Sequence, residues 1–396
     1  MSNSIPEFRH FSNYLPYSKA VFYQTKKNHT FSIIIIRNFT ANIRILIFYK
    51  PEPHTNFTLS KQKLIYIKKT LFMQKPTYFF YFFLMLLLLP ISCKVQAQSD
   101  SHLTGAEYVD QSLYRNREIL PDVLGKPDPN LEKTLVQVKG NLYRHTNGTL
   151  PALHSGLVLI TKEGAIVIDP ALTQAAIWLN EEIKRKFNVP VKYVILTHAH
   201  YDHAGGSQIF QKEGAKVIIQ KNGLEPIIGE KLPVAVPDIV YDKQLTIKLG
   251  GETVIVNHIA PSHSNSMSVV SFPKYKALQL TDVGESKTMP YNDFLDFYYD
   301  GWIATLDWAL QQNVDYIDVG HYTPATLEDI RKEREYMVNL HQQVLDLVRS
   351  GQSWDELYRH VKFSDEVKKW GGFDTMNKLN ILGMFRWVSN HRRGTW

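Results

Sequence analysis

Cysteine is almost absent from this chain: Cys93 is the only one in 396 residues. A single cysteine cannot form an internal disulfide, and the cleavage predicted below would remove it from the mature protein together with any thiolate ligand. Stability must then come from burial of apolar side chains, for which roughly 300 residues are ample.

Acidic residues are scarce in the first quarter of the chain. Residues 1–97 contain 13 Lys and Arg against 2 Asp and Glu, whereas the whole chain has 45 and 38, so residues 98–396 carry 32 basic and 36 acidic side chains. A basic balance is typical of proteins that bind nucleic acids or membrane surfaces, but here the excess belongs to the N-terminal part alone. We therefore expect no nucleic-acid partner.

A hydrophobic run long enough to cross a membrane comfortably is also missing. The most apolar stretch, residues 78–89, has the length found in signal peptides. Lys75 supplies a charged flank, Met73 a natural start, and residues 95–97 the small-residue pattern for cleavage. We predict an export signal at residues 73–97 and a periplasmic or secreted protein that meets the membrane only through this signal.

The N-terminal part has two alternatives to cleavage before Gln98, and residues 1–72 have an unusual composition. An uncleaved membrane anchor is the main alternative, and Cys93 is a less favoured lipidation site because residues 90–92 match the usual lipobox poorly. Residues 1–72 nearly lack acids and contain no methionine between Met1 and Met73. We expect a start assigned too far upstream, so that this segment is either not made or disordered.

The remaining chain divides by composition into three parts. Residues 98–133 are polar and are expected to form a surface arm, 134–325 alternate strands with helices, and 326–396 are expected to form a helical cover. Apolar patterning predicts strands at 135–138, 141–143, 155–160, 165–169, 191–196, 216–219, 245–248, 253–256, 266–272, 277–280 and 316–319. It predicts helices at 173–187, around 208–210, at 300–312 and at 325–349, with further helices in 353–390.

The densest group of metal-binding side chains follows the strand at 191–196. Three histidines and an aspartate fall within six residues, as His198, His200, Asp202 and His203. His198 and His200 are two apart, so an extended chain or tight turn can point both imidazoles the same way. Imidazole nitrogen and carboxylate oxygen together suit zinc or a similar divalent ion. The alternative is a solvated polar loop.

Three later positions also stand at predicted strand ends. His263 follows Pro261, Asp282 follows the strand at 277–280, and His321 follows Gly320. Each has a structural reading as a turn or cap residue. Their shared placement favours a ligand role for all three.

Taken in order, residues 198–203, 261–264, 280–282 and 319–321 resemble the signature of the metallo-β-lactamase-fold hydrolase superfamily. The resemblance covers about residues 134–325. It implies an α+β fold, an αββα four-layer sandwich, here with a C-terminal helical extension. The strand-rich pattern itself also suggests two packed sheets covered by helices.

Residue by residue, the resemblance implies two metal sites. His198, His200 and His263 would hold one ion, and Asp202, His203 and His321 the other, with Asp282 bridging. Two zinc ions per chain would generate a bridging hydroxide at neutral pH, and Asp202 would also direct its proton as a catalytic group. Iron or manganese is an alternative to zinc.

The resulting expectation is an exported dinuclear zinc hydrolase that cleaves a small ester, lactone, thioester or β-lactam-type amide. An aspartate at 282 resembles the glyoxalase II type and departs from the β-lactamase branch that uses a thiolate there. The alternatives are a mononuclear iron persulfide dioxygenase and a non-catalytic metal-binding or relay protein of the same fold. Substrate-pocket candidates are Met289, Tyr291 and Phe294.

Three other polar residues have no place in this ligand set. His154 and His258 are expected to be structural, with His154 near the pocket mouth. Asp169 is expected to be a supporting carboxylate.

Overall fold

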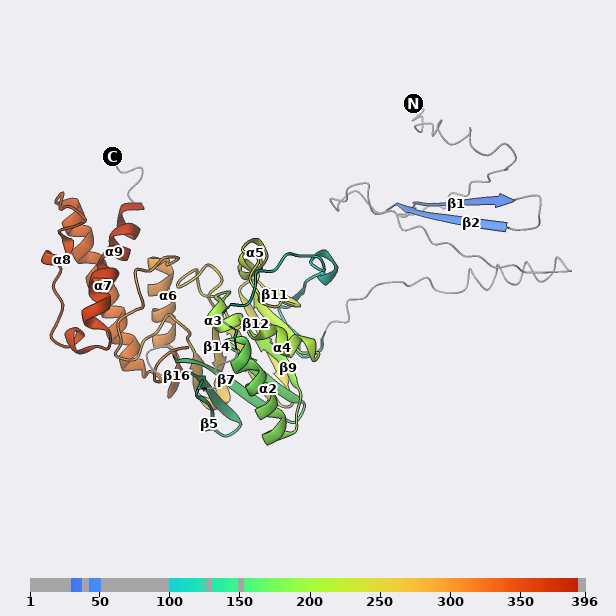
Figure 1. Cartoon of the computed structure of the whole chain (residues 1–396), viewed down its shortest axis with the longest axis horizontal. Coiled ribbons are helices and arrows are strands. Elements are labelled where there is room, and N and C mark those ends of the chain that lie inside the picture. The colour runs from blue at the N-terminus through green and yellow to red at the C-terminus, as the bar shows by residue number, and fades with distance from the viewer. Residues whose placement is uncertain are drawn as a thin grey trace, which may run out of the picture. The chain divides into compact units, whose positions relative to one another are not determined.

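The computed structural model describes residues 30–37, 43–50, 100–123, 125–126, 130–148 and 153–390. The chain divides into two compact units, Met1–Lys94 and Val95–Trp396. In the first unit, β1 (Thr30–Arg37) pairs with β2 (Ile43–Lys50) in antiparallel register (Figure 1). The rest of residues 1–72 and the expected signal at 73–97, with Cys93, lie outside the described residues.

The second unit is built on two β-sheets. One consists of β4 (Glu107–Tyr108), β5 (Lys133–Lys139), β6 (Leu142–Asn147), β7 (His154–Thr161), β8 (Gly164–Ile168), β9 (Val191–Ile195), β10 (Lys216–Gln220) and β11 (Ile239–Tyr241), in the order β4-β11-β10-β9-β8-β7-β6-β5. The other consists of β3 (Leu103–Thr104), β12 (Gln244–Leu249), β13 (Glu252–Asn257), β14 (Val269–Phe272), β15 (Ala277–Gln279) and β16 (Tyr316–Asp318), in the order β16-β15-β14-β13-β12-β3.

Successive strand residues face two different hydrophobic cores. In β8, Ile166 belongs to the core between the two sheets, whereas Val167 belongs to the core on the opposite face. In β14 of the other sheet, Val270 joins the core between the sheets and Val269 a third core on the far side. This period of two is what strands buried on both faces require.

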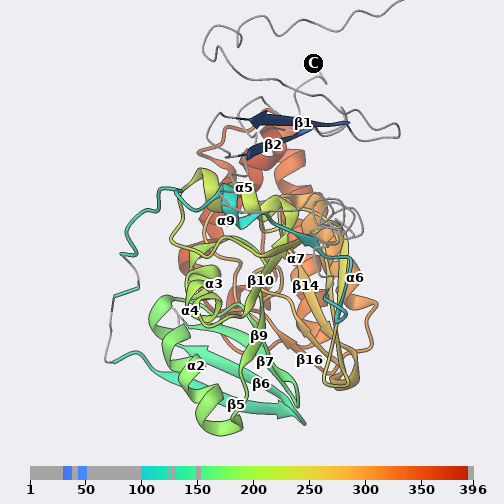
Figure 2. The same ribbon diagram turned by 90° about the vertical axis from the view of Figure 1, so that its right-hand side faces the viewer.

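Helices cover the outer face of each sheet. The eight-stranded sheet packs against α2 (Thr173–Phe187), α4 (Ser207–Lys212) and α5 (Leu224–Gly229), and Figure 2 shows α2 in front of its strands. The six-stranded sheet packs against α6 (Tyr299–Leu310) and α7 (Leu327–Arg349). The layers therefore run helix, sheet, sheet, helix, which confirms the predicted αββα sandwich.

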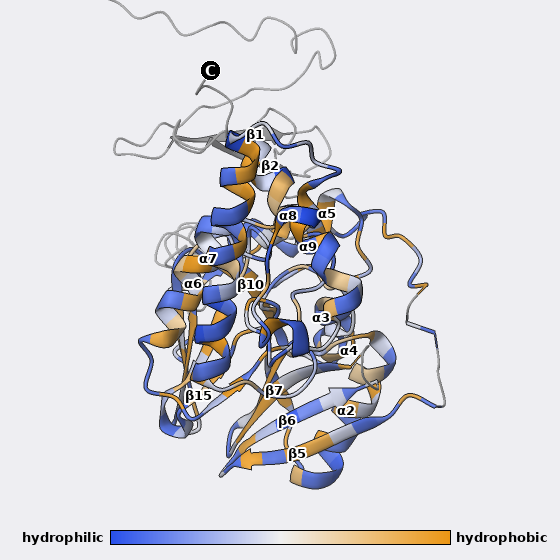
Figure 3. Ribbon diagram, turned by 90° about the vertical axis from the view of Figure 1, so that its left-hand side faces the viewer, coloured by the Kyte–Doolittle hydropathy of each residue, from blue (hydrophilic) through white to orange (hydrophobic). Residues whose placement is uncertain are grey.

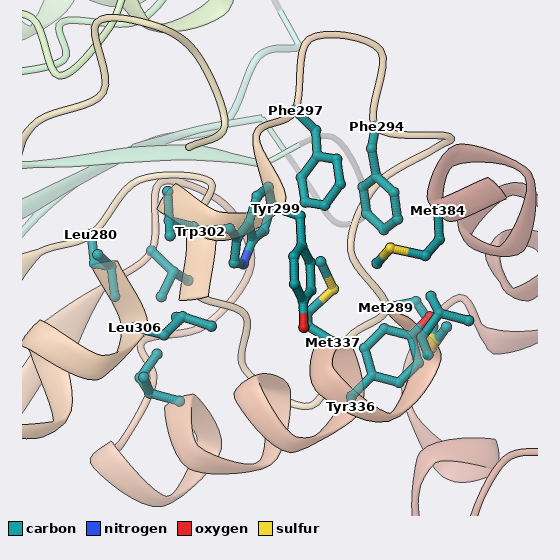
Figure 4. Packing of buried hydrophobic residues seen from close by; sticks show 14 of the residues in the cluster. Leu280, Met289, Phe294, Phe297, Tyr299, Trp302, Leu306, Tyr336, Met337 and Met384 are labelled. Atoms are coloured by element: carbon teal, nitrogen blue, oxygen red, sulfur yellow. The ribbon is translucent and has the colours of Figure 1, made fainter. Parts of the chain in front are cut away.

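The C-terminal helices extend the core on the six-stranded side. α8 (Leu357–His360) and α9 (Phe373–Asn390) pack with α7, whose turns carry both hydrophobic and hydrophilic residues (Figure 3). Within this core Phe294 lies beside Phe297 and faces Met384 of α9 (Figure 4). A buried hydrogen bond from Tyr336 Oη to Asn380 Oδ1, 2.8 Å long, also joins α7 to α9.

Most of the regular elements agree with the apolar patterning, but β11 and α5 were not predicted. The helix at 173–187 has the predicted bounds, and the long helix begins at Leu327 because Thr326 forms a capping box with Asp329. Short 3-10 turns lie at Gln111–Leu113, Lys221–Gly223, Pro273–Tyr275 and Val367–Lys369. No helix within the described ranges combines the length and apolarity needed to cross a membrane.

The N-terminal arm contributes to both sheets. Its strand β3 pairs with β12, and β4 pairs with β11, each as an antiparallel edge strand of two residues. The arm thus places one short strand at the edge of each sheet.

Candidate metal centre

The histidine-rich segment is the connection from β9 to α4. After the buried strand the chain runs through Thr197 to His200, which is the N-cap of the one-turn helix α3 (Tyr201–Ala204). This turn carries Asp202 and His203, and the ring centroid of His203 is 5.0 Å from that of His198. The Gly205-Gly206 pair then leads into α4, as the sequence predicts.

Gly206 allows this segment to lie against α2. A Cβ atom at residue 206 would come 2.3 Å from the Cβ atom of Ala176. The Gly206 N–H also donates to the carbonyl of Ala171 at 2.6 Å. Only glycine permits this close approach, which fixes how far the histidine-rich loop stands from the helix layer.

The three remaining predicted ligands come from the six-stranded sheet. His263 lies in the loop from β13 to β14, Asp282 follows β15, and His321 follows β16. β15 and β16 are parallel neighbours, so their carboxyl ends lie at the same edge. All seven predicted ligands are thereby brought together at the edge where both sheets end.

One group of side chains gathers His198, His200, His263 and Asp282, whose ligand atoms lie within 4.8 Å of one another. His200 Nδ1 is 3.0 Å from His263 Nε2, and Asp282 Oδ2 is 3.4 Å from Nε2 of both His198 and His263. Two ligands about 2.0–2.1 Å from one tetrahedral ion are about 3.3 Å apart. The spacing therefore fits a shared ion.

A second group gathers His203, His321 and Asp282, with Asp202 beside them. The Nε2 atoms of His203 and His321 are 3.1 Å apart, and each lies close to Asp282, at 3.0 and 3.2 Å. Asp202 Oδ2 is 3.3 Å from His203 Nε2 and 3.5 Å from His321 Nε2. Asp282 belongs to both groups, as a bridging ligand would.

Hydrogen bonds behind two histidines aim their lone pairs at the centre. His321 Nδ1 is 2.9 Å from the carbonyl of Leu153, which can only accept, so Nδ1 carries the proton and Nε2 is free to bind an ion. His200 Nε2 donates to Asp296 Oδ2 at 2.6 Å, which leaves Nδ1 facing His263. Such partners orient metal-binding imidazoles and raise their basicity.

His198 is oriented through a buried carboxylate. Thr197 donates its hydroxyl to Asp169 at 2.7 Å, so the same oxygen accepts from His198 Nδ1 at 3.0 Å. Asp169 also accepts from the hydroxyl of Thr281 at 2.8 Å, and burial raises its pKa to about 6. His198 Nε2 points at Asp282 and, within the described ranges, has no hydrogen-bond partner. A buried nitrogen in this state fits a site that binds a cation.

The charges of the site are tightly interdependent. Burial opposes ionisation of Asp282, but His203 and His321 hold its pKa well below the usual value. Burial lowers the pKa of His203, yet Asp282 and Asp202 together raise it to about 10. Without a metal His203 therefore holds a proton that a divalent ion must displace, whereas burial lowers the pKa of His198 and His263 and keeps these imidazoles neutral.

Two polar residues join the site without having been predicted as members. Asp296, from the loop before α6, bonds to His200, and His154, at the start of β7, stands beside Asp202. His154 Nε2 is 3.5 Å from Asp202 Oδ2, and these two residues with His321 form a further group of potential ligands. Asp296 offered no signal in the sequence, because its loop is aromatic and irregular.

The three pocket candidates have different surroundings. Met289 and Phe294 are 1% and 7% exposed and belong to the core beneath α7 and α9 (Figure 4), which does not favour direct contact with a substrate. Tyr291 is 69% exposed. His258, which was expected to be structural, has its Nδ1 atom 2.8 Å from the carbonyl of Met267.

A buried ion pair fixes the segment that leads to His321. Arg144 of β6 pairs with Asp318 at the end of β16, and Asp318 also accepts from Ser155 Oγ at 2.7 Å and from the Gly320 N–H at 3.0 Å. The second Arg144 nitrogen donates to the carbonyl of Tyr322 at 2.7 Å. The turn that carries His321 is thus bonded on both sides to the eight-stranded sheet.

The chain is similar in sequence to known metallo-beta-lactamases. Residues 152–321 match the family model of the metallo-beta-lactamase superfamily. The chain is 28% identical to the metallo-beta-lactamase type 2 of Elizabethkingia meningoseptica, over 49% of this chain and 79% of that protein. It is 26% identical to the metallo-beta-lactamase type 2 of Bacillus cereus, over 48% of this chain and 76% of that protein. A solved metallo-beta-lactamase from Pontibacter korlensis is 20% identical, with a TM-score of 0.48, over 52% of this chain and all of that one.

The family-model match and the curated relatives all point to the metallo-beta-lactamase superfamily. They support a metal-dependent hydrolase, and the chain has a cluster of histidines and aspartates that can hold metal ions.

Proposed function

We propose that the protein is an exported dinuclear zinc hydrolase that cleaves a small ester, lactone, thioester or β-lactam-type amide. The observation that carries this proposal is the convergence of seven donor side chains: six form two groups that share Asp282, and Asp202 lies beside the second group. A site for a single ion would not need the second group. Two relatives named metallo-beta-lactamase support the inclusion of β-lactams among the substrates tested.

The residues present fit a pair of zinc ions. Five neutral imidazoles suit a borderline-soft cation, and two carboxylates offset part of the charge of two dications. When bound, such a pair supplies an acidified water and polarises a carbonyl group. The chain itself holds and orients these ligands through Asp296, Thr197 and the carbonyl of Leu153.

The two carboxylates have different roles in this proposal. The side chain of Asp282 is 9% exposed and contacts histidines of both groups, so it serves to hold the site together. The side chain of Asp202 is 37% exposed and can exchange a proton with solvent. We therefore assign to Asp202 the transfer of a proton away from the attacking water.

Metal analysis of the purified full-length protein tests the proposal. We expect about two zinc per chain, and hydrolysis of at least one member of a panel of esters, lactones, thioesters and β-lactams that is lost on chelation. One iron per chain with oxygen uptake on a persulfide would replace the proposal by the dioxygenase alternative. Two zinc without turnover of any panel member would favour a non-catalytic metal-binding protein.

Export is a separate part of the proposal. It rests on the apolar run at residues 78–89 and the small residues before Gln98, and implies a periplasmic or secreted enzyme acting on a small molecule. Mass spectrometry of the protein recovered from fractionated cells tests it. A mature N-terminus at Gln98 in an extracytoplasmic fraction is expected. A lipid on Cys93 or an intact residue 73–97 segment would contradict cleavage before Gln98, and recovery from the cytoplasmic fraction would contradict export.

A further inference from the structure

His154 lies against the second metal group although the motif that defines this group does not include it. Its Nε2 is 3.5 Å from Asp202 Oδ2. Its ring centroid is 4.9 Å from that of His321 and 6.0 Å from that of His203. The ligand atoms of His154, Asp202 and His321 all lie within 4.8 Å of one another.

The backbone holds His154 beside His321. The two residues form an isolated antiparallel bridge. The Ser155 N–H donates to the carbonyl of Gly320 at 2.6 Å, and His321 Nδ1 donates to the carbonyl of Leu153 at 2.9 Å. Bonds on both sides of His154 thus connect it to the segment of His321, and this segment is itself bonded to β6 and β7 through Asp318.

The distance to Asp202 distinguishes two roles for His154. Hydrogen bonds from nitrogen to oxygen are ordinarily about 2.7–3.2 Å long, so 3.5 Å is too long for a good one. The same 3.5 Å separates Asp202 Oδ2 from His321 Nε2, and 3.3 Å separates it from His203 Nε2. His154 is therefore spaced from Asp202 as the two expected ligands are.

We propose that His154 is a direct ligand of the second metal ion, together with Asp202, His203, His321 and the bridging Asp282. The inference rests on the proposed dinuclear function and deepens it. It makes the pair of sites unequal, since the second has five protein donors and the first has four. Fewer positions then stay open to water or substrate at the second site than at the first.

Stepwise metal affinity of the full-length protein tests this role. The two dissociation constants for Zn²⁺ are measured by competition with a chromophoric chelator, and the spectrum of the Co²⁺ form reports ligand number. We expect His154→Ala to weaken the binding of one of the two ions by more than about 100-fold. Loss of a residue that only supports a ligand typically weakens binding by about 10–100-fold. The affinity for the other ion should change by less than about threefold, because its four donors are untouched.

Two further variants separate ligation from other effects. His154→Gln keeps a donor that could hydrogen-bond to Asp202, so restored affinity would show a positioning role and overturn the proposal. His258→Ala is the matched control, since His258 is also half-buried but bonds to the carbonyl of Met267. Circular dichroism and thermal unfolding check that each variant is folded.

The outcomes also distinguish this inference from the proposed function. Wild-type protein that binds two ions, with His154→Ala binding them as tightly, would overturn only the role of His154. Wild-type protein that binds fewer than two ions would overturn the dinuclear function on which it rests.

Discussion

Asp282 adopts an uncommon backbone conformation for a side chain shared by both metal groups. Its φ angle is +59°, in the left-handed region that aspartate and asparagine tolerate better than most residues. Its N–H donates to the carbonyl of Val319 at 3.1 Å, which ties it to the segment before His321. Asparagine can keep this conformation, so Asp282→Asn removes the charge with little change of shape.

We expect Asp282→Asn to lower turnover by about 100-fold or more and to weaken binding of at least one zinc ion, because loss of a ligand should cost more than loss of a supporting residue. Steady-state kinetics and metal analysis measure both effects. Asp315→Asn, at an exposed position paired with Lys139, is the control. Unchanged metal content and activity would argue against a bridging role.

Asp296 supports a ligand and does not contact the centre itself. Its carboxylate accepts from His200 Nε2 at 2.6 Å. We expect Asp296→Asn to weaken the binding of zinc at the first site by about 10–100-fold. Turnover at saturating zinc should largely return, since the ligand itself remains. Chelator competition measures the affinity, and zinc titration of the rate measures the recovery.

Asp293→Asn is a matched control from the same loop, where Asp293 pairs with Arg386 at 3.0 Å. Equal zinc affinity in the Asp296 variant and in this control would show that the bond to His200 has no part in metal binding.

At the scale of single residues, the sequence predicts what is local. His198 to His203 can be recognised because four candidate ligands stand together after one apolar strand. Asp296 cannot, since it reaches His200 from 96 positions away and only the folded loop brings the two together. His154 stood alone in the sequence, and its relation to Asp202 depends on the pairing of β7 with the segment of His321.

Among the elements, the connection between β15 and α7 contains a buried pair of acidic side chains. Glu285 donates its backbone N–H to the carboxyl group of Glu333 on α7, which also accepts from Trp302 Nε1 at 3.3 Å. Burial raises the pKa of Glu333 to about 8, and burial together with the neighbouring Glu333 raises that of Glu285 well above its usual value. The pair is therefore held protonated in the folded protein near neutral pH.

This pair makes stability depend on pH. Because the folded pKa values lie above the unfolded value of about 4.3, the stabilisation is complete below that value and is lost as pH rises through about 8. Glu285→Gln removes one of the two ionisable carboxyl groups without removing the acceptor for Trp302. We expect it to reduce the loss of stability between pH 6 and pH 9 by on the order of 1 kcal/mol, or a few degrees in Tm.

Thermal unfolding of the wild type and the variant across this pH range measures the difference. Glu335→Gln, at an exposed position of the same helix, is the control. The same pH dependence in Glu285→Gln and in the wild type would show that the buried pair does not govern it.

The elements that the sequence failed to predict include the two shortest strands. β3 and β4 have two residues each, too few to show a period, and their pairing is decided by the edges of β12 and β11. Longer elements such as α2 and β7 are evident because their apolar residues repeat at the helical or strand period.

At the scale of the whole molecule, metal binding should contribute to stability. The candidate ligands from 198 to 321 come together only in the folded chain, so a metal ion would bind the folded form in preference to the unfolded one. At free zinc 100-fold above the dissociation constant, each site adds about 2.7 kcal/mol to the free energy of unfolding. We expect chelation to lower Tm by several degrees and added zinc to restore it.

Differential scanning calorimetry with chelator, with zinc and with magnesium measures this linkage. Magnesium serves as the control because it prefers oxygen ligands and retains its water. Equal Tm values with zinc and with chelator would contradict the linkage.

Because the ligands come from two different sheets, the centre would also have a mechanical role. His198 to His203 follow a strand of the eight-stranded sheet, whereas His263, Asp282 and His321 follow strands of the six-stranded one. No cysteine occurs in residues 98–396. A bound metal pair would thus act as a cross-link of the kind that many secreted proteins obtain from disulfides. Acid or a chelator would open this cross-link, whereas a reductant would leave it closed, so its strength follows pH and zinc supply rather than redox potential.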